Sequence, residues 1–142
     1  MEINSEQKRL LLKGALWIGI VLDGLFALDM TVVGMFGTIT VLTIPFTTIE
    51  AISMDYRYAL LVAAGTMWGW TALLGWAAMK PVERKDIALI TAVPVIIVEM
   101  VANLFAGMNE LFTYQDTLLK IGVQTLLLVM FVISYFINRN QD

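Results

Sequence analysis

The chain has 142 residues and is too apolar for a soluble domain of that size. Apolar residues make up 59% of it, charged residues only 15%, and the mean hydropathy is +0.80. In water such a chain would expose large apolar patches, so lipid must be its solvent. The net charge of −3 argues against a nucleic-acid partner, which would need a basic face to neutralise phosphates.

The sequence contains neither cysteine nor histidine. The first absence excludes disulfides, thiol chemistry and thiolate metal sites, and the second removes the commonest general base. No catalytic, metal-binding or nucleotide-binding motif is present, so we assign no catalytic residue and expect no cofactor and no metal site. Any chemistry must use carboxylates, hydroxyls, amides, lysine or arginine.

Four apolar segments are long enough to cross a bilayer, which takes about 20 residues for a hydrocarbon core of about 30 Å. They cover residues 10–30, 58–79, 87–108 and 118–137. Their continuous apolar runs predict helices, because the strands of a membrane barrel would alternate. We therefore predict an all-α membrane protein in which a single domain forms a four-transmembrane-helix bundle.

The positive charges are unevenly distributed over the ends of these segments. Only Arg57 and Lys120 fall on one side, whereas the other side carries Lys8, Arg9, Lys13, Lys80, Arg84, Lys85 and Arg139. Lysine and arginine accumulate in cytoplasmic loops. The distribution predicts that both termini and the loop 80–86 are cytoplasmic, in a multi-pass protein of the cell membrane.

Residues 31–55 are too apolar for an ordinary loop, and we assign them to an outer interfacial segment. In one interpretation the first helix continues to about Phe36, an extended piece follows over 38–44, and 46–54 form a short amphipathic helix on the outer membrane surface. Such a segment could cover the bundle as a lid. The simpler interpretation is a connector that packs on the helix ends.

The second segment carries small residues at Gly65, Gly69 and Ala72, a spacing that allows helices to approach closely. They favour packing within the bundle, which would place Gly69 at a close helix contact, and the alternative is a homodimer face. Trp68 and Trp70 lie near mid-membrane, away from the interfaces where indoles usually anchor. Either they fill the core or they form the wall of a ligand pocket.

Ionisable residues inside the spans indicate a functional site more strongly than the glycines and tryptophans do. Asp23 lies 13 residues into the first segment and Glu99 lies 12 residues into the third, which runs the same way. Both are thus about 18 to 20 Å from the inner surface. Asn103 follows Glu99 by one turn on the same face. A carboxylate at a helix centre costs about 2.5 to 3.5 kcal/mol to insert and usually faces the bundle interior or water.

Asp29, Arg57 and Gln124 also map to the outer half. Together these residues predict a polar cavity open to the outside, in which Arg57 pairs with Asp29 or Asp23. The Asp23 and Glu99 carboxylates would hold a shared proton or a hard cation. The alternative is a hydrogen-bonded cluster that fixes helix register and binds nothing.

Part of the chain resembles small prokaryotic four-helix membrane proteins of uncharacterised function. The resemblance rests on the stretches Asp55-Tyr-Arg-Tyr, Gly65-Thr-Met-Trp-Gly-Trp-Thr, Lys80-Pro-Val-Glu-Arg-Lys-Asp and Leu89-Ile-Thr. It covers the second helix, the loop that follows and the start of the third helix. It implies a four-helix membrane fold and carries no activity or site residue with it.

Three classes of function fit the sequence. The first is a bundle that binds or transports a small ligand, a proton or a cation in its outer cavity. The second is a structural or accessory subunit whose polar cluster only fixes helix packing, for which the bilayer and a second copy are the expected partners. The third is a lipid-modifying enzyme that uses Asp23 and Glu99 as acid and base.

Overall fold

The fold is described from a computed structural model that defines residues 4–37, 53–110 and 113–140. These residues form helices and short connections, and four helical spans are long and apolar enough to cross a membrane. The third span is divided into three consecutive elements. The elements are α1 (Ser5–Phe36), α2 (Met54–Met79), α3 (Asp86–Ile90), η2 (Thr91–Ile96), α4 (Ile97–Met108) and α5 (Tyr114–Asn138).

Capping residues define where the long helices begin. Asn4 and Gln7 form a capping box at the start of α1, and Ser53 and Thr113 accept backbone N–H bonds at the starts of α2 and α5. Gly37 ends α1 in the left-handed conformation, with φ 67°. The four predicted helices are confirmed, and the first, second and fourth are longer than the predicted segments because these polar caps lie outside the apolar runs.

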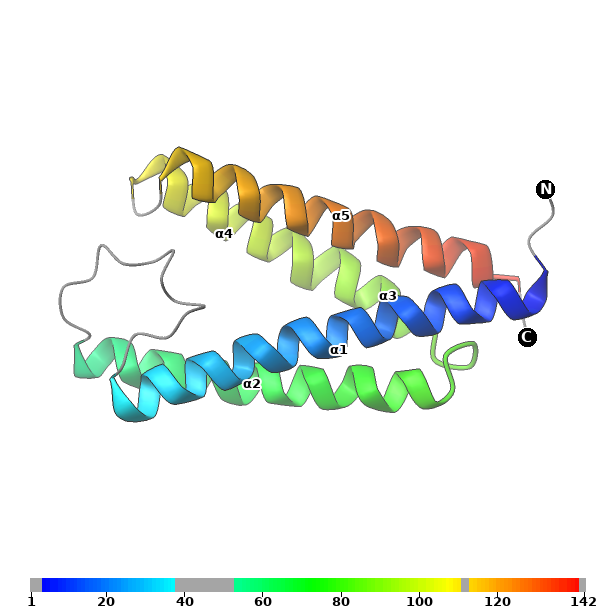
Figure 1. The fold of residues 1–142 in the computed structure, drawn as a ribbon, viewed down its shortest axis with the longest axis horizontal. Coiled ribbons are helices and arrows are strands. Elements are labelled where there is room, and N and C mark those ends of the chain that lie inside the picture. The colour runs from blue at the N-terminus through cyan, green and yellow to red at the C-terminus, as the bar shows by residue number, and fades with distance from the viewer. Residues whose placement is uncertain (1–3, 38–52, 111–112, 141–142) are drawn as a thin grey trace.

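The spans pack as two antiparallel pairs. The first pair is α1 with α2, and the second is α5 with the span formed by α3, η2 and α4. The pairs meet near the start of α1 and the end of α5, and they separate towards the other end of the molecule (Figure 1). We call these the terminal end and the open end.

Hydrogen bonds tie three segments together at the terminal end. The buried side chain of Asn138 donates from Nδ2 to the carbonyl oxygen of Lys8 over 2.9 Å, which joins α5 to α1. Lys85, in the loop before α3, donates from Nζ to the carbonyl oxygen of Arg139 over 2.9 Å. The start of α1, the end of α5 and the loop 80–85 therefore lie at the same end of the bundle.

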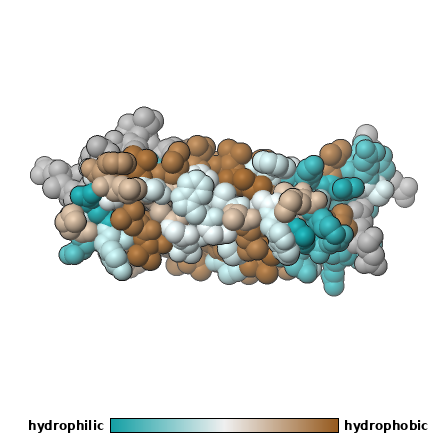
Figure 2. Space-filling view, turned by 90° about the horizontal axis from the view of Figure 1, so that it is seen from below, coloured by the Kyte–Doolittle hydropathy of each residue, from teal (hydrophilic) through white to brown (hydrophobic). Residues whose placement is uncertain are grey.

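The apolar core occupies the terminal half. Its buried members are Leu12, Ala15, Leu16, Leu74, Ala77, Ala78, Ala88, Ala92, Ile96 and Phe131. The helices approach closely at Gly19, where an added Cβ would lie 2.9 Å from the Phe131 ring and 3.1 Å from Leu74. Towards the open end, by contrast, α4 contains no buried residue. Hydrophobic side chains cover much of the middle of the surface, and hydrophilic ones gather at the terminal end (Figure 2).

Pro94 interrupts regular winding in the third span. Proline has no N–H to donate, and in an α-helix its ring would clash with the carbonyl of Ile90. The chain accommodates it in a single wide π-helical stretch, Thr91–Ile96. The proline therefore causes a local change of winding just before Glu99.

The interfacial segment predicted over residues 31–55 is shorter in the structure. Residues 31–36 continue α1, as the first interpretation proposed, and α2 already begins at Met54. The extended piece expected over 38–44, and the amphipathic helix expected over 46–54 up to residue 52, lie outside the described residues.

The small residues of α2 do not pack within the bundle, and that prediction was wrong. Gly65, Gly69 and Ala72 are exposed, and a Cβ added at either glycine would meet nothing within 4 Å. The reason is that α2 contacts α1 through another face, where Leu61 crosses Gly34 of α1. The close helix approaches are therefore made at Gly19 and Gly34 of α1 and at Gly107 of α4, which meets Thr117 of α5.

The two kinds of glycine predict opposite effects for one substitution. Gly19→Leu should destabilise the bundle by about 1 to 3 kcal/mol, because its side chain would overlap Phe131 and Leu74. Gly69→Leu should leave the stability of the monomer nearly unchanged. Thermal unfolding of both variants in detergent, followed by circular dichroism, compares them directly. Equal losses of melting temperature would contradict the assignment of these faces.

Candidate functional site

The predicted acidic pair lies just beyond the apolar core. Asp23 is one turn past Gly19 on α1, and Glu99 is three residues past the buried Ile96 on the third span. Both side chains are half-buried. Within the described chain no hydrogen bond connects the two carboxyl groups. The two carboxyl groups therefore lie just beyond the same core without bonding to each other directly.

Gln124 brings α5 into the same site. Its Nε2 donates to Oε2 of Glu99 over 3.4 Å, which connects α5 to α4. Its Oε1 is buried and has no hydrogen-bond partner. The amide thus uses its donor to hold the carboxylate and leaves an acceptor unmatched, which is costly in an apolar environment.

Asn103 continues the site one turn beyond Glu99, and its side chain is half-buried. Because Gln124 bonds Glu99 in an antiparallel pair, Lys120, four residues before Gln124, lies level with Asn103. The Nζ of Lys120 is buried, so this lysine belongs to the polar stripe between α4 and α5. The sequence interpretation treated Lys120 only as a flanking charge. Lys120 precedes Gln124 by four residues, and this spacing predicts that the two side chains share one face of the helix.

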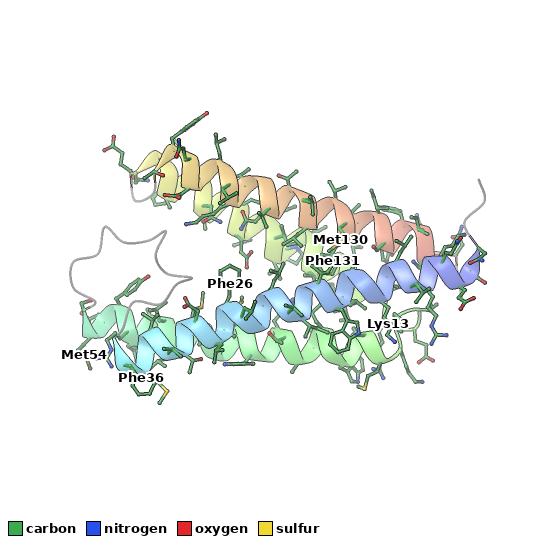
Figure 3. All side chains as sticks on the ribbon, viewed as in Figure 1. Lys13, Phe26, Phe36, Met54, Met130 and Phe131 are labelled. Carbon is green, nitrogen blue, oxygen red and sulfur yellow. The ribbon has the colours of Figure 1, made fainter. Side chains whose placement is uncertain are left out.

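The site lies where the two helix pairs separate. Within the described residues, α1 packs against the third span mainly through α3, whereas α4 packs mainly against α5. The first and third spans are therefore neighbours, as predicted, only near the terminal end, and Asp23 and Glu99 lie on helices that diverge beyond it. Phe26 projects from α1 into the space between the pairs and is 41% exposed (Figure 3).

Arg57 does not join this site. Its Nε donates to the carbonyl oxygen of Gly34 over 3.0 Å, and a second guanidinium nitrogen donates to the carbonyl oxygen of Met35. The guanidinium thus satisfies carbonyls in the last turn of α1, which have no partner within the helix. In the described parts of the chain it forms no ion pair with Asp29 or Asp23, so the predicted pairing was wrong.

Asp29 is also separate from the acidic pair. It lies six residues beyond Asp23, which is about 9 Å along α1 and about 120° around it. The residue is 8% exposed, and its Oδ1 has no hydrogen-bond partner. Asp29 is therefore a buried carboxyl group in the open half that is not connected to Glu99.

The two tryptophans of α2 differ in their surroundings. Trp68 is 45% exposed, and its indole N–H donates to the hydroxyl of Thr31 over 3.2 Å, so it lies at the seam between α1 and α2 and not at the predicted site. Trp70 packs against the apolar core one turn from Leu74, and its Nε1 is buried without a partner. Only Trp70 could form a wall beside the core.

The donor set suits an organic cation better than a coordinated metal. No three histidine, cysteine, aspartate or glutamate side chains of the described residues lie together as a metal site. Two carboxylates supply negative charge, and amide groups supply hydrogen bonds. An ammonium group needs only charge and acceptors, whereas Ca²⁺ takes six to eight oxygen ligands.

Comparisons with known protein families, with curated proteins and with solved structures found no match to this chain. The function must therefore be argued from the geometry of the site.

The position of Arg57 gives a prediction that separates capping from ion pairing. Arg57→Met should lower stability by about 1 to 2 kcal/mol, because it leaves carbonyls at the end of α1 without donors. The same loss should occur in an Asp29→Asn background, since the two side chains do not interact. A double-mutant cycle of detergent unfolding measures the coupling. Coupling beyond about 0.5 kcal/mol would restore the ion pair between these residues.

Proposed function

We propose that this protein is a multi-pass protein of the cell membrane that binds or transports a small ligand or cation at the Asp23–Glu99 site. Its termini and the loop 80–85 lie in the cytoplasm, and its open end faces outside. The excess of lysine and arginine at the terminal end supports this orientation. The Asp23–Glu99 site would then be reached from outside.

The observation that carries the proposal is that Asp23 and Glu99 are half-buried carboxyl groups inside the spans and neither has a cation to neutralise it. Within the described chain, no lysine or arginine forms an ion pair with either carboxylate. Two carboxylates in an environment of low dielectric constant have an unfavourable electrostatic free energy. This free energy becomes less unfavourable when a cation or proton binds. Two carboxyl groups without an ion pair therefore favour a positively charged occupant, in a stripe where Lys120 lies one turn from Gln124.

A register-fixing cluster explains the same residues less well. Such a cluster stabilises a bundle when its polar groups satisfy one another. Here Gln124 reaches Glu99 through a long bond of 3.4 Å and leaves its Oε1 unmatched. Asn103 has no hydrogen bond to another described side chain. Incomplete internal satisfaction favours a site that is completed by something else.

One observation supports the alternative that the protein is a structural or accessory membrane subunit. The exposed face of α2 with Gly65, Gly69 and Ala72 has the spacing of a close helix contact, and α2 packs mainly on α1 within the monomer. A homodimer through this face is compatible with a binding function, since the Asp23–Glu99 site lies between other helices.

The orientation is tested with single cysteines, because the chain has none of its own. Cysteines at Ser5, Glu83 and Arg139 should be protected from an impermeant maleimide in intact cells, and one at Thr113 should be labelled. All four positions are exposed, so accessibility within the protein is matched. Labelling of the first three without permeabilisation would reverse the proposed orientation.

The binding function is tested by removing one charge while preserving shape. Glu99→Gln should keep the melting temperature of the parent within a few degrees but weaken binding of ethidium, a fluorescent organic cation, by about tenfold or more. The reason is that glutamine retains the hydrogen bond and loses the negative charge. Fluorescence anisotropy of ethidium with the purified protein in lipid nanodiscs provides the measurement.

The matched control is Glu83→Gln, the same chemical change at an exposed loop position whose salt bridge is with Lys80. It should bind ethidium like the parent. If Glu99→Gln also binds like the parent, the acidic pair is a packing feature and the accessory-subunit alternative is favoured.

A further inference from the structure

The cations of the terminal end differ in their partners. Those of the loop before α3 are engaged in contacts within the protein. Lys80 forms a salt bridge with Glu83 over 2.9 Å. Arg84 lies over the Trp76 ring and donates to the carbonyl oxygen of the same residue. Lys85 donates from Nζ to carbonyl oxygens at the end of α5. The positive charge of this loop therefore serves the bundle itself.

Two cations of α1 lack such partners. Arg9 and Lys13 are exposed, and within the described residues neither side chain forms a hydrogen bond or an ion pair. Glu6 precedes Arg9 by three residues and is not paired with it. The two cations are four residues apart, so they lie on one side of the helix about 6 Å apart along its axis. Like charges at this spacing destabilise a helix, and an anion bound between them would remove the repulsion.

The surface beside these cations is open to lipid. Lys13 lies inside the first apolar span, where a lysine extends its aliphatic stem along apolar surface and its charge towards the headgroups. Trp17, one turn further along α1, is 52% exposed. Between them Gly14 is exposed, and a Cβ added there would meet nothing within 4 Å. No other described helix covers this part of α1.

The same side of α1 becomes aliphatic towards mid-membrane. Val21 and Leu25 follow Trp17 at further steps of four residues and are about half exposed. We call Arg9, Lys13, Trp17, Val21 and Leu25 the α1 stripe. Lys13 lies near the terminal end (Figure 3), where hydrophilic side chains gather beside the hydrophobic middle of the surface (Figure 2). The order of cations, indole and aliphatic groups matches the phosphate, glycerol and acyl chains of a phospholipid.

We propose that the α1 stripe binds an anionic phospholipid of the membrane leaflet at the terminal end. The phosphate lies between Arg9 and Lys13, where the guanidinium group can donate two parallel hydrogen bonds to its oxygens. The glycerol lies beside Trp17, and the acyl chains follow the aliphatic part of the stripe. Phosphatidylcholine is disfavoured, because its quaternary ammonium group offsets the charge of its phosphate beside two protein cations.

The test measures lipid preference by native mass spectrometry of the full chain. The protein is released from detergent micelles that contain equal amounts of dioleoylphosphatidylglycerol and dioleoylphosphatidylcholine, which have identical acyl chains. The parent should retain at least about fivefold more phosphatidylglycerol than phosphatidylcholine. Added glycerol phosphate, which has the phosphate and no acyl chain, should not displace the bound phosphatidylglycerol.

A pair of matched variants locates the preference. Lys13→Gln should lower the preference for phosphatidylglycerol at least about threefold, because it removes one of the two unpaired charges. Lys13→Arg should retain the preference. The control is Lys80→Gln, the same change at an exposed position of the same end where the charge is engaged with Glu83. It should alter the preference by less than about 1.5-fold.

Loss of the preference in Lys13→Gln, with recovery in Lys13→Arg, supports a lipid site on the α1 stripe. Equal retention of both lipids by the parent overturns it. An equal loss in Lys13→Gln and Lys80→Gln also overturns it, because the attraction would then come from the overall charge of the terminal end. Displacement by glycerol phosphate would overturn the lipid as occupant. None of these outcomes depends on ligand binding at the acidic site, so the two proposals can fail separately.

Discussion

The close contact at Gly19 determines how the rest of the bundle is arranged. Because this residue has no side chain, the Phe131 ring of α5 and Leu74 of α2 reach the backbone of α1 at the same level. Three helices are thereby held together at one point of the apolar core. Beyond that point the two antiparallel pairs separate, so the first polar residues past it, Asp23 and Glu99, are neither packed in the core nor directed wholly to lipid.

Hydrogen bonds between segments are concentrated at the terminal end. Lys85 and Asn138 donate to backbone carbonyls there, and the Arg84 guanidinium lies 3.6 Å from the centre of the Trp76 ring. These contacts connect helices and do not need a ligand. Buried acceptors without a partner occur at both ends, on Asn138 at the terminal end and on Gln124 and Asp29 in the open half.

Local sequence patterns predicted the spans and the depth of the acidic pair, because both depend only on apolar run length and on the rise per residue. Local sequence patterns could not predict which face of each helix packs against a neighbouring helix. Gly69 has the spacing of a packing glycine but is exposed, whereas Gly19 is isolated in the sequence and makes a close contact with two other helices. Arg57 was assigned to an aspartate on the basis of charge, yet its partners are backbone carbonyls at the end of α1, which composition does not reveal.

The wide winding at Thr91–Ile96 also changes how the third span tolerates length variation. A π turn takes up roughly one residue more than an α turn, and one residue corresponds to about 100° of rotation. Deleting one residue from this stretch could restore ordinary winding and leave Glu99 and Asn103 facing the same way. The winding is regular between Ile97 and Glu99. Deleting one residue there would rotate the part of the helix after the deletion by about 100° relative to the part before it. Pro94 therefore marks the place where this span can lose a residue and keep its polar face.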